Sequence, residues 1–91
     1  MERVRRTMPA DVGRLLQDAR LRAGLRLREA ARVVGISHSH LVRLEACLRV
    51  PSRTVAVLLA DALALTDAER ARLLEVAVTD AGRDWHGRQA A

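Results

Sequence analysis

Apolar residues recur at three- and four-residue spacing along most of this 91-residue chain, which is the period of an amphipathic helix. In the first such stretch, Val12, Leu15, Leu16, Ala19 and Ala23 form one stripe. The pattern restarts four more times, and each restart follows a glycine, a proline or a good capping residue. The sequence therefore predicts five helices, over about residues 9–23, 27–34, 37–46, 53–64 and 67–78.

Signals for helix ends support this division. Gly24 and Gly35 follow the first two helices, where glycine adopts the left-handed turn that ends a helix. Ser37 is a good N-cap for the third helix, and Thr66 with Glu69 forms the T-x-x-E capping box of the fifth. Two short helices are thus expected on either side of a tight turn at Gly35.

The expected core is aliphatic, because the chain has one Trp and no Phe or Tyr. Its predicted members after the first helix are Leu27, Ala30, Ala31, Val34, Leu41, Leu44, Val55, Leu58, Leu59, Ala62, Leu63, Leu73, Leu74, Ala77 and Val78. A chain of this length forms one small domain. We place it at residues 9–79, with a basic arm over residues 1–8 and a polar tail over residues 80–91.

Charge is distributed unevenly along the chain. All sixteen basic residues are Arg, and twelve of them lie in residues 1–53 with five acidic residues. Residues 54–91 hold four Arg and six acidic residues. A basic front and a mildly acidic rear are typical of a domain that presents one face to a polyanion. A solvated surface of a basic protein is the alternative interpretation.

Other functional classes find little support. A single cysteine, Cys47, allows no internal disulfide and fits a reducing compartment, so a cytoplasmic location is expected. No apolar run approaches membrane length. His38 and His40 are two residues apart on a helix and diverge, which argues against a metal site with Cys47 and His86. We predict no catalytic residue, no metal and no cofactor, and hence no enzyme.

Residues 24–51 carry the most specific pattern: GLRLREAARVVGISHSHLVRLEACLRVP. Together with RLLQDARLRAGL before it and VAVLLADALALTDAERARLL after it, this segment resembles the helix-turn-helix domain of lambdoid phage repressors, Cro proteins and xenobiotic-response-element (XRE) regulators. The resemblance runs from about Arg14 to Leu74. It implies a compact, all-α, five-helix lambda-repressor-like fold, in which the third helix lies in the DNA major groove.

The resemblance also implies roles for residues. His38, Ser39 and Arg43 match base-reading positions, and Val42 either contacts a thymine methyl group or is simply exposed. The alternative for His38, Ser39 and Arg43 is a contact to the sugar-phosphate backbone or to solvent. Matching or neighbouring positions for backbone contacts are Arg26, Arg28, Ser37, His40, Arg49 and Arg53.

The family pattern further implies an internal pair between Arg20, late in the first helix, and Glu45, late in the third. The chain departs from that pattern at three points, one of which is the apolar residue Val42 at an outward position. Arg26 and Leu27 stand where relatives have a Ser or Thr cap and a phosphate-binding Gln, and Leu27 cannot make that contact. Cys47 stands where relatives have Gly, so either that turn is strained or the loop differs.

The predicted function is sequence-specific binding of double-stranded DNA by a transcriptional regulator, in the form of a repressor that binds a two-fold operator as a homodimer. Trp85 is the candidate dimer anchor, with packing onto its own domain as the alternative. The rival function is an antitoxin or protein-interaction module that uses the same fold to bind a partner protein such as a toxin.

Overall fold

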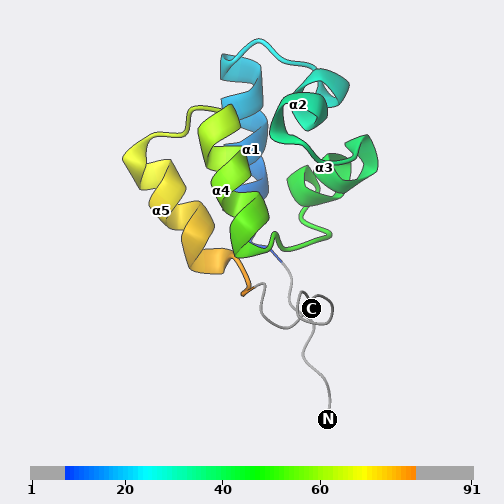
Figure 1. The fold of residues 1–91 in the computed structure, drawn as a ribbon. Coiled ribbons are helices and arrows are strands. Elements are labelled where there is room, and N and C mark those ends of the chain that lie inside the picture. The colour runs from blue at the N-terminus through cyan, green and yellow to red at the C-terminus, as the bar shows by residue number, and fades with distance from the viewer. Residues whose placement is uncertain (1–7, 80–91) are drawn as a thin grey trace, which may run out of the picture.

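The computed structural model describes residues 8–79, and within that range the chain forms five α-helices (Figure 1). Two separate contacts join the ends of this range to the segment between the third and the fourth helix. The helices are α1 (Ala10–Arg22), α2 (Leu27–Val34), α3 (His38–Glu45), α4 (Arg53–Ala62) and α5 (Asp67–Val76). The predicted all-α, five-helix fold is confirmed.

Short polar side chains cap the starts of three helices. The Ser37 hydroxyl accepts a hydrogen bond from the His40 N–H at 3.0 Å, and the Ser52 hydroxyl accepts one from Val55 at the start of α4. At α5, Thr66 and Glu69 form both hydrogen bonds of the predicted capping box. These caps satisfy N–H groups that have no partner inside the helix.

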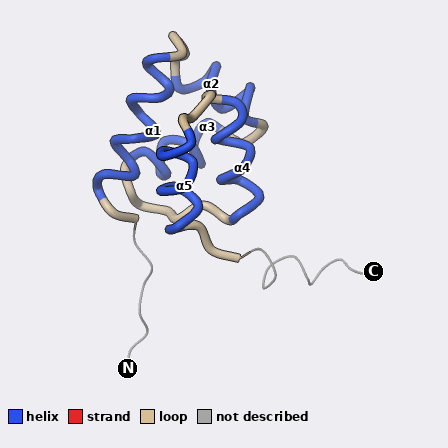
Figure 2. Tube along the Cα trace, turned by 90° about the vertical axis from the view of Figure 1, so that its left-hand side faces the viewer, coloured by secondary structure: helices blue, strands red, loops and turns tan. Residues whose placement is uncertain are grey.

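The core lies where all five helices meet. Its fully buried large side chains are Leu16, Leu41, Leu44, Leu59, Leu63, Leu73 and Val12. Helix α1 packs against α3 and α5, α4 packs against α2 and α5, and α2 packs against α3. The tube in Figure 2 shows the same grouping from the side. The aliphatic interior expected from the composition is therefore shared by every helix.

Several predicted details at the edges of the core are wrong. Met8, assigned to the arm, is 4% exposed and belongs to the core. Leu58 is 40% exposed, and Ala23 is also exposed. Of the residues predicted for the buried face of the fifth helix, only Leu73 is fully buried. Leu74 in α5 is half-buried, and so are Ala77 and Val78 after its end. The predicted buried faces of these helices include too many residues, because apolar spacing alone does not show how much of a helix its neighbours cover.

Helices α4 and α5 end two residues earlier than expected, at Ala62 and Val76. Ala64 adopts a left-handed conformation with φ 52°, which stops α4 without a glycine. Beyond α5, Val78 pairs with Ser52 in an isolated parallel bridge: its N–H donates to Pro51 and its carbonyl accepts from Arg53. This pairing pulls the chain out of the helix. Helices α1 and α3 are each shorter by one residue at both ends than predicted.

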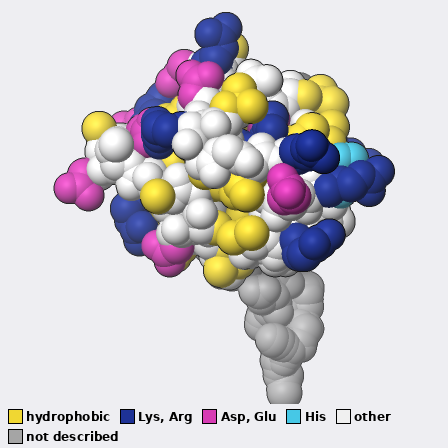
Figure 3. All heavy atoms as spheres, turned by 90° about the horizontal axis from the view of Figure 1, so that it is seen from above, with side chains coloured by type: hydrophobic (Ala, Val, Ile, Leu, Met, Phe, Trp, Pro, Cys, Tyr) yellow, Lys and Arg dark blue, Asp and Glu magenta, His cyan; other side chains and the backbone are white. Residues whose placement is uncertain are grey.

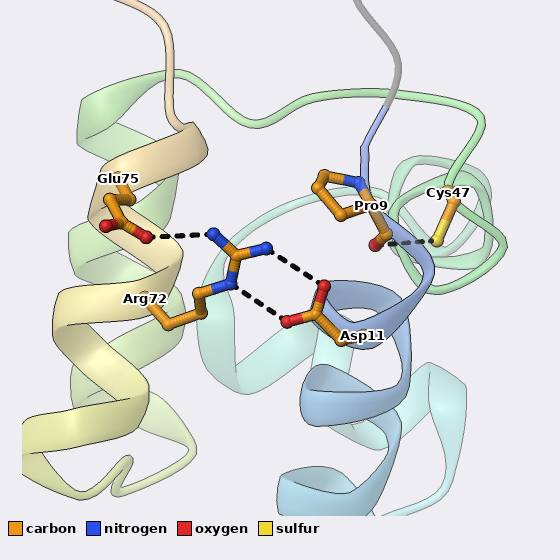
Figure 4. A network of polar contacts seen from close by, with 5 residues as sticks. All are labelled: Pro9, Asp11, Cys47, Arg72 and Glu75. Carbon is orange, nitrogen blue, oxygen red and sulfur yellow. Dashed lines mark hydrogen bonds and ion pairs between the residues drawn. The ribbon is translucent and has the colours of Figure 1, made fainter.

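Two bidentate ion pairs join α1 to α5. Asp11 binds Arg72 at 2.9 Å, and Arg72 also binds Glu75 (Figure 4). At the other end of α1, Arg22 binds both carboxylate oxygens of Glu69. The bond from Arg72 lowers the pKa of Asp11, and the bond from Arg22 lowers the pKa of Glu69, because each arginine favours the ionised carboxylate. No described helix is long and apolar enough to cross a membrane.

Candidate functional site

Helices α2 and α3 form a unit around one tight turn. Gly35 has φ 93°, a left-handed conformation that glycine adopts without strain. The N–H groups of Gly35 and Ile36 both donate to the Ala31 carbonyl, which closes the end of α2. Ser37 then caps α3 two residues later. A single glycine and a single serine thus set the point at which one helix stops and the next begins.

Helix α3 has a buried face and an open face. Leu41 and Leu44 are fully buried against the core. On the opposite side, Ser39 and Arg43 are exposed and Val42 is 38% exposed. Ala46, which caps the end of α3, is exposed on this same side one turn after Val42. We call Ser39, Val42, Arg43 and Ala46 the outer face of α3.

The two histidines flank the outer face. His38 and His40 are both half-buried. His38 lines a shallow hollow together with residues at the start of α2, namely Arg26, Leu27, Arg28 and Glu29. The structure therefore brings the beginnings of α2 and α3 to one place on the surface. Positive partial charge from both helix starts is concentrated there.

Arg20 and Glu45 lie together, as the family pattern implied. The Arg20 Nε donates to one oxygen of Glu45 at 2.7 Å, and a second guanidinium nitrogen donates to the other oxygen at 3.0 Å. The third nitrogen donates to the Leu25 carbonyl. Both side chains are only 9% exposed. Arg20 thus joins α1, the α1–α2 turn and the end of α3, and it occupies the one carboxylate that α3 carries.

Gly13 allows the end of α3 to approach α1 closely. A Cβ at this position would lie 2.6 Å from the Glu45 carbonyl oxygen and would also collide with the Cys47 sulfur. Cys47 has φ 65°, so the turn after α3 is left-handed although a cysteine and not a glycine stands there. Its thiol donates a hydrogen bond to the Pro9 carbonyl at 3.5 Å (Figure 4). This contact ties the turn after α3 to the start of α1.

The arginines of residues 8–79 separate into two groups. Arg20, Arg22, Arg70 and Arg72 form ion pairs that hold helices together. The others make no ion pair with another described residue, and six of these seven lie between residues 26 and 53: Arg26, Arg28, Arg32, Arg43, Arg49 and Arg53, with Arg14 as the seventh. Figure 3 shows arginine side chains gathered with histidine on the side of α2 and α3.

Few negative charges lie between these six arginines. Residues 26–53 contain only two acidic side chains, Glu29 and Glu45. Glu45 is neutralised by Arg20, and Glu29 accepts a hydrogen bond from the Arg26 N–H at 2.8 Å at the start of α2. The predicted contact residues Arg49 and Arg53 are both exposed, in the α3–α4 loop and at the first position of α4. This surface therefore has a net positive charge, because six arginines face one exposed carboxylate that no described arginine pairs with, Glu29.

Sequence reasoning missed three residues of this site. Ala46 shares the outer face of α3 and lies seven residues after Ser39, a helical spacing that could have revealed it. Arg32 belongs to the unpaired group on α2. Gly13 gave no signal, because a glycine inside a helix reveals its purpose only when the opposing backbone is known. Trp85 lies outside the described residues.

Among the residues that the structure describes, no group of three or more His, Cys, Asp or Glu side chains is placed to hold a metal ion. In a comparison with known protein families, residues 11–73 match the model of a family described as helix-turn-helix domain. No curated protein and no solved structure matches the chain.

Proposed function

The chain belongs to the helix-turn-helix domain family, of the XRE and Cro type, and from this we propose that it binds specific sites in double-stranded DNA as a transcriptional regulator. The observation that carries the proposal is the group of six arginines on and beside α2 and α3 that form no ion pair with any residue of the range 8–79. Four of the other five arginines of residues 8–79, all but Arg14, are paired with carboxylates. Phosphate groups of DNA would supply the missing counter-charges.

In this proposal α3 lies in the major groove with its outer face toward the base pairs. Arg43 is exposed and forms no ion pair with the part of the chain that the structure describes, so its guanidinium is available for bidentate hydrogen bonds to guanine. Ser39 and His38 supply single hydrogen bonds to base edges. The Arg20–Glu45 pair holds the helix at a fixed angle and keeps the Glu45 charge away from phosphate.

Contacts to the sugar-phosphate backbone come from the edges of the unit. We assign them to Arg26 and Arg28 beside the α2 start, to Ser37 and His40 at the start of α3, and to Arg49 and Arg53 after it. The Leu27 side chain has no hydrogen-bond donor, so Arg26 and Arg28 bind phosphate at the start of α2 in its place. Arg32, exposed further along α2, extends the same surface.

We further propose that the protein acts as a homodimer on a two-fold operator and represses transcription by occlusion. One helix in one groove covers only about half of a typical operator, and two-fold protein symmetry matches two half-sites about 34 Å apart. Trp85 remains our candidate anchor for the second subunit. A Trp85→Ala variant that dissociates at higher concentration in analytical ultracentrifugation would support this role, whereas an unchanged dimer would exclude it.

The direct test is selection of bound sequences from a random pool of double-stranded DNA. We expect an enriched motif with two inverted half-sites. Arg43→Ala should then lose the preference for this motif over random DNA, while weak general binding persists. Arg70→Ala is the matched control, because it removes the same charge from the exposed Arg70–Asp61 pair on the α4–α5 side.

Three outcomes decide between the proposals. Loss of affinity in Arg43→Ala for all DNA equally would place Arg43 on phosphate rather than on a base. Enrichment of a single half-site would contradict the dimer. Failure to enrich any duplex would overturn DNA binding and leave the protein-interaction alternative, for which a partner protein should then bind the same surface.

A further inference from the structure

The outer face of α3 lacks the side chains that recognise adenine through paired hydrogen bonds. Asn and Gln bind the N6 and N7 atoms of adenine with their carboxamide groups. The chain contains no Asn, and its two Gln residues are Gln17 in α1 and Gln89 near the C-terminus. Ser39 offers one hydroxyl, which bonds almost any base edge. Among the outer-face side chains, only Arg43 can make a bidentate contact, and its donors suit guanine rather than adenine.

The same face has no free carboxylate to accept a hydrogen bond from cytosine. Glu45 is the one acidic residue on α3, and both of its oxygens are bound by Arg20. Recognition of G·C pairs therefore depends on the guanine side of the pair. A·T pairs require another means of recognition, and in the major groove the remaining distinctive feature is the C5-methyl group of thymine.

Val42 and Ala46 provide apolar surface for such a methyl group. They are four residues apart and the Ala46 N–H donates to the Val42 carbonyl, so they lie one above the other on the same side of the helix. Four residues rise about 6 Å, close to two base-pair steps of about 3.4 Å. Val42 is 38% exposed between Ser39 and Arg43, and Ala46 is short enough to let DNA approach the helix closely.

We propose that α3 recognises A·T pairs of its half-site through thymine methyl groups, with Val42 as the specificity-determining contact and Ala46 as its neighbour, and that Arg43 fixes an adjacent guanine. This inference rests on the proposed DNA-binding function and specifies the chemistry of its substrate. A half-site of this kind contains at least one thymine within two base steps of a guanine.

The test replaces thymine by deoxyuridine, one position at a time, in a duplex that carries the selected motif. Uracil keeps every hydrogen-bonding group of thymine and lacks only the methyl group. Burial of one methyl group corresponds to about a fourfold change in affinity. We expect one or two positions at which uracil weakens binding by about that factor, as measured by fluorescence anisotropy.

Val42→Ala should bind the thymine duplex about as weakly as the wild type binds the uracil duplex, and its affinity should no longer depend on that methyl group. Val42→Thr, which replaces one methyl by a hydroxyl at nearly the same volume, should lose part of the dependence. Val33→Ala is the matched control, because Val33 is a 58% exposed valine on α2 and lies outside the outer face of α3. It should keep the full dependence on the methyl group.

The outcomes separate this inference from the function on which it rests. Uracil sensitivity that disappears in Val42→Ala supports it. An enriched motif whose affinity is indifferent to uracil everywhere, or equally sensitive in Val42→Ala and wild type, overturns it while DNA recognition stands. Failure to enrich any motif overturns both.

Discussion

Arg20 joins three segments of the fold through one guanidinium group. Its side chain is almost buried and donates to both oxygens of Glu45 and to the Leu25 carbonyl. A buried ion pair of this kind contributes modest net stability, but removal of one partner leaves an uncompensated charge. Gly13 and Cys47 act at the same junction, where the α1 and α3 backbones meet without space for a further methyl group.

Glu45→Ala should therefore destabilise the domain by about 3 kcal/mol, the range for breaking a buried pair, and should also weaken DNA binding because α3 loses its anchor. Thermal unfolding and anisotropy titrations measure the two effects. Glu75→Ala serves as control, because it removes an exposed carboxylate from Arg72 and should change the melting temperature little. An unchanged melting temperature and affinity in Glu45→Ala would contradict the positioning role.

Ala64 is a second residue whose backbone determines its effect. It is exposed and has φ 52° directly after α4, a conformation that costs a side-chain-bearing residue about 1 kcal/mol. Ala64→Gly should stabilise the domain by up to about 1 kcal/mol, because glycine adopts this turn without strain. Chemical denaturation measures the change. Ala71→Gly, at an exposed position in the middle of α5, should be destabilising by a similar amount and is the opposing control.

At the scale of elements, two different kinds of contact hold the helices. Helix α4 packs on α2 and α5 and buries the apolar side chains Ala56, Leu59 and Ala60, whereas ion pairs at both ends of α1, which we call the clamps, join α1 to α5. Figure 4 shows one of these clamps, in which Arg72 lies between Asp11 and Glu75. The α2–α3 unit, which we propose faces DNA, is not part of these ion pairs, so acid should affect the α1–α5 contact first.

The clamps predict a specific pH dependence. The pKa values of Asp11 and Glu69 are lowered in the folded state, so their contribution to stability is present above the pKa of the unfolded chain and is lost as the pH falls through the folded value. The melting temperature should decline as the pH falls below about 4.5. The double variant Asp11→Asn, Glu69→Gln should melt lower at pH 7 and decline less steeply. Parallel pH profiles would exclude the clamps as the cause.

At the scale of the whole molecule, charge is divided between structure and surface. The arginines bound to carboxylates lie on α1 and α5, and most of those without an ion pair to a described residue lie on and beside α2 and α3. The ends of the described range also return to the α3–α4 segment, through Pro9 with Cys47 and Val78 with Ser52. Both ends of the described range therefore contact the segment between α3 and α4, beside the proposed DNA surface.

This division predicts how salt affects binding. Affinity for DNA should fall steeply with salt concentration, because each arginine–phosphate contact releases counterions. Arg28→Ala should reduce the slope of log K against log salt by about one and weaken binding to all sequences alike. Arg70→Ala should leave the slope unchanged. Equal slopes for wild type and Arg28→Ala would place Arg28 away from phosphate.

The five helices, the turn at Gly35 and the caps at Ser37 and Thr66 could be predicted from the sequence. The family resemblance also predicted the pair between Arg20 and Glu45. These are local or family-level signals: helical periodicity, a glycine at a left-handed turn and short side chains that accept N–H groups. The base-contact and phosphate-contact assignments came from the same pattern and stay predictions.

The surfaces that neighbouring helices cover are visible only in the tertiary structure. It placed Met8 in the core and Leu58 at the surface, showed that Gly13 makes room for the end of α3, and separated paired from unpaired arginines. It also placed Ala46 beside Val42 on the open face of α3. Exposure and pairing depend on what another helix brings to the same point in space, and no periodicity within one segment contains that information.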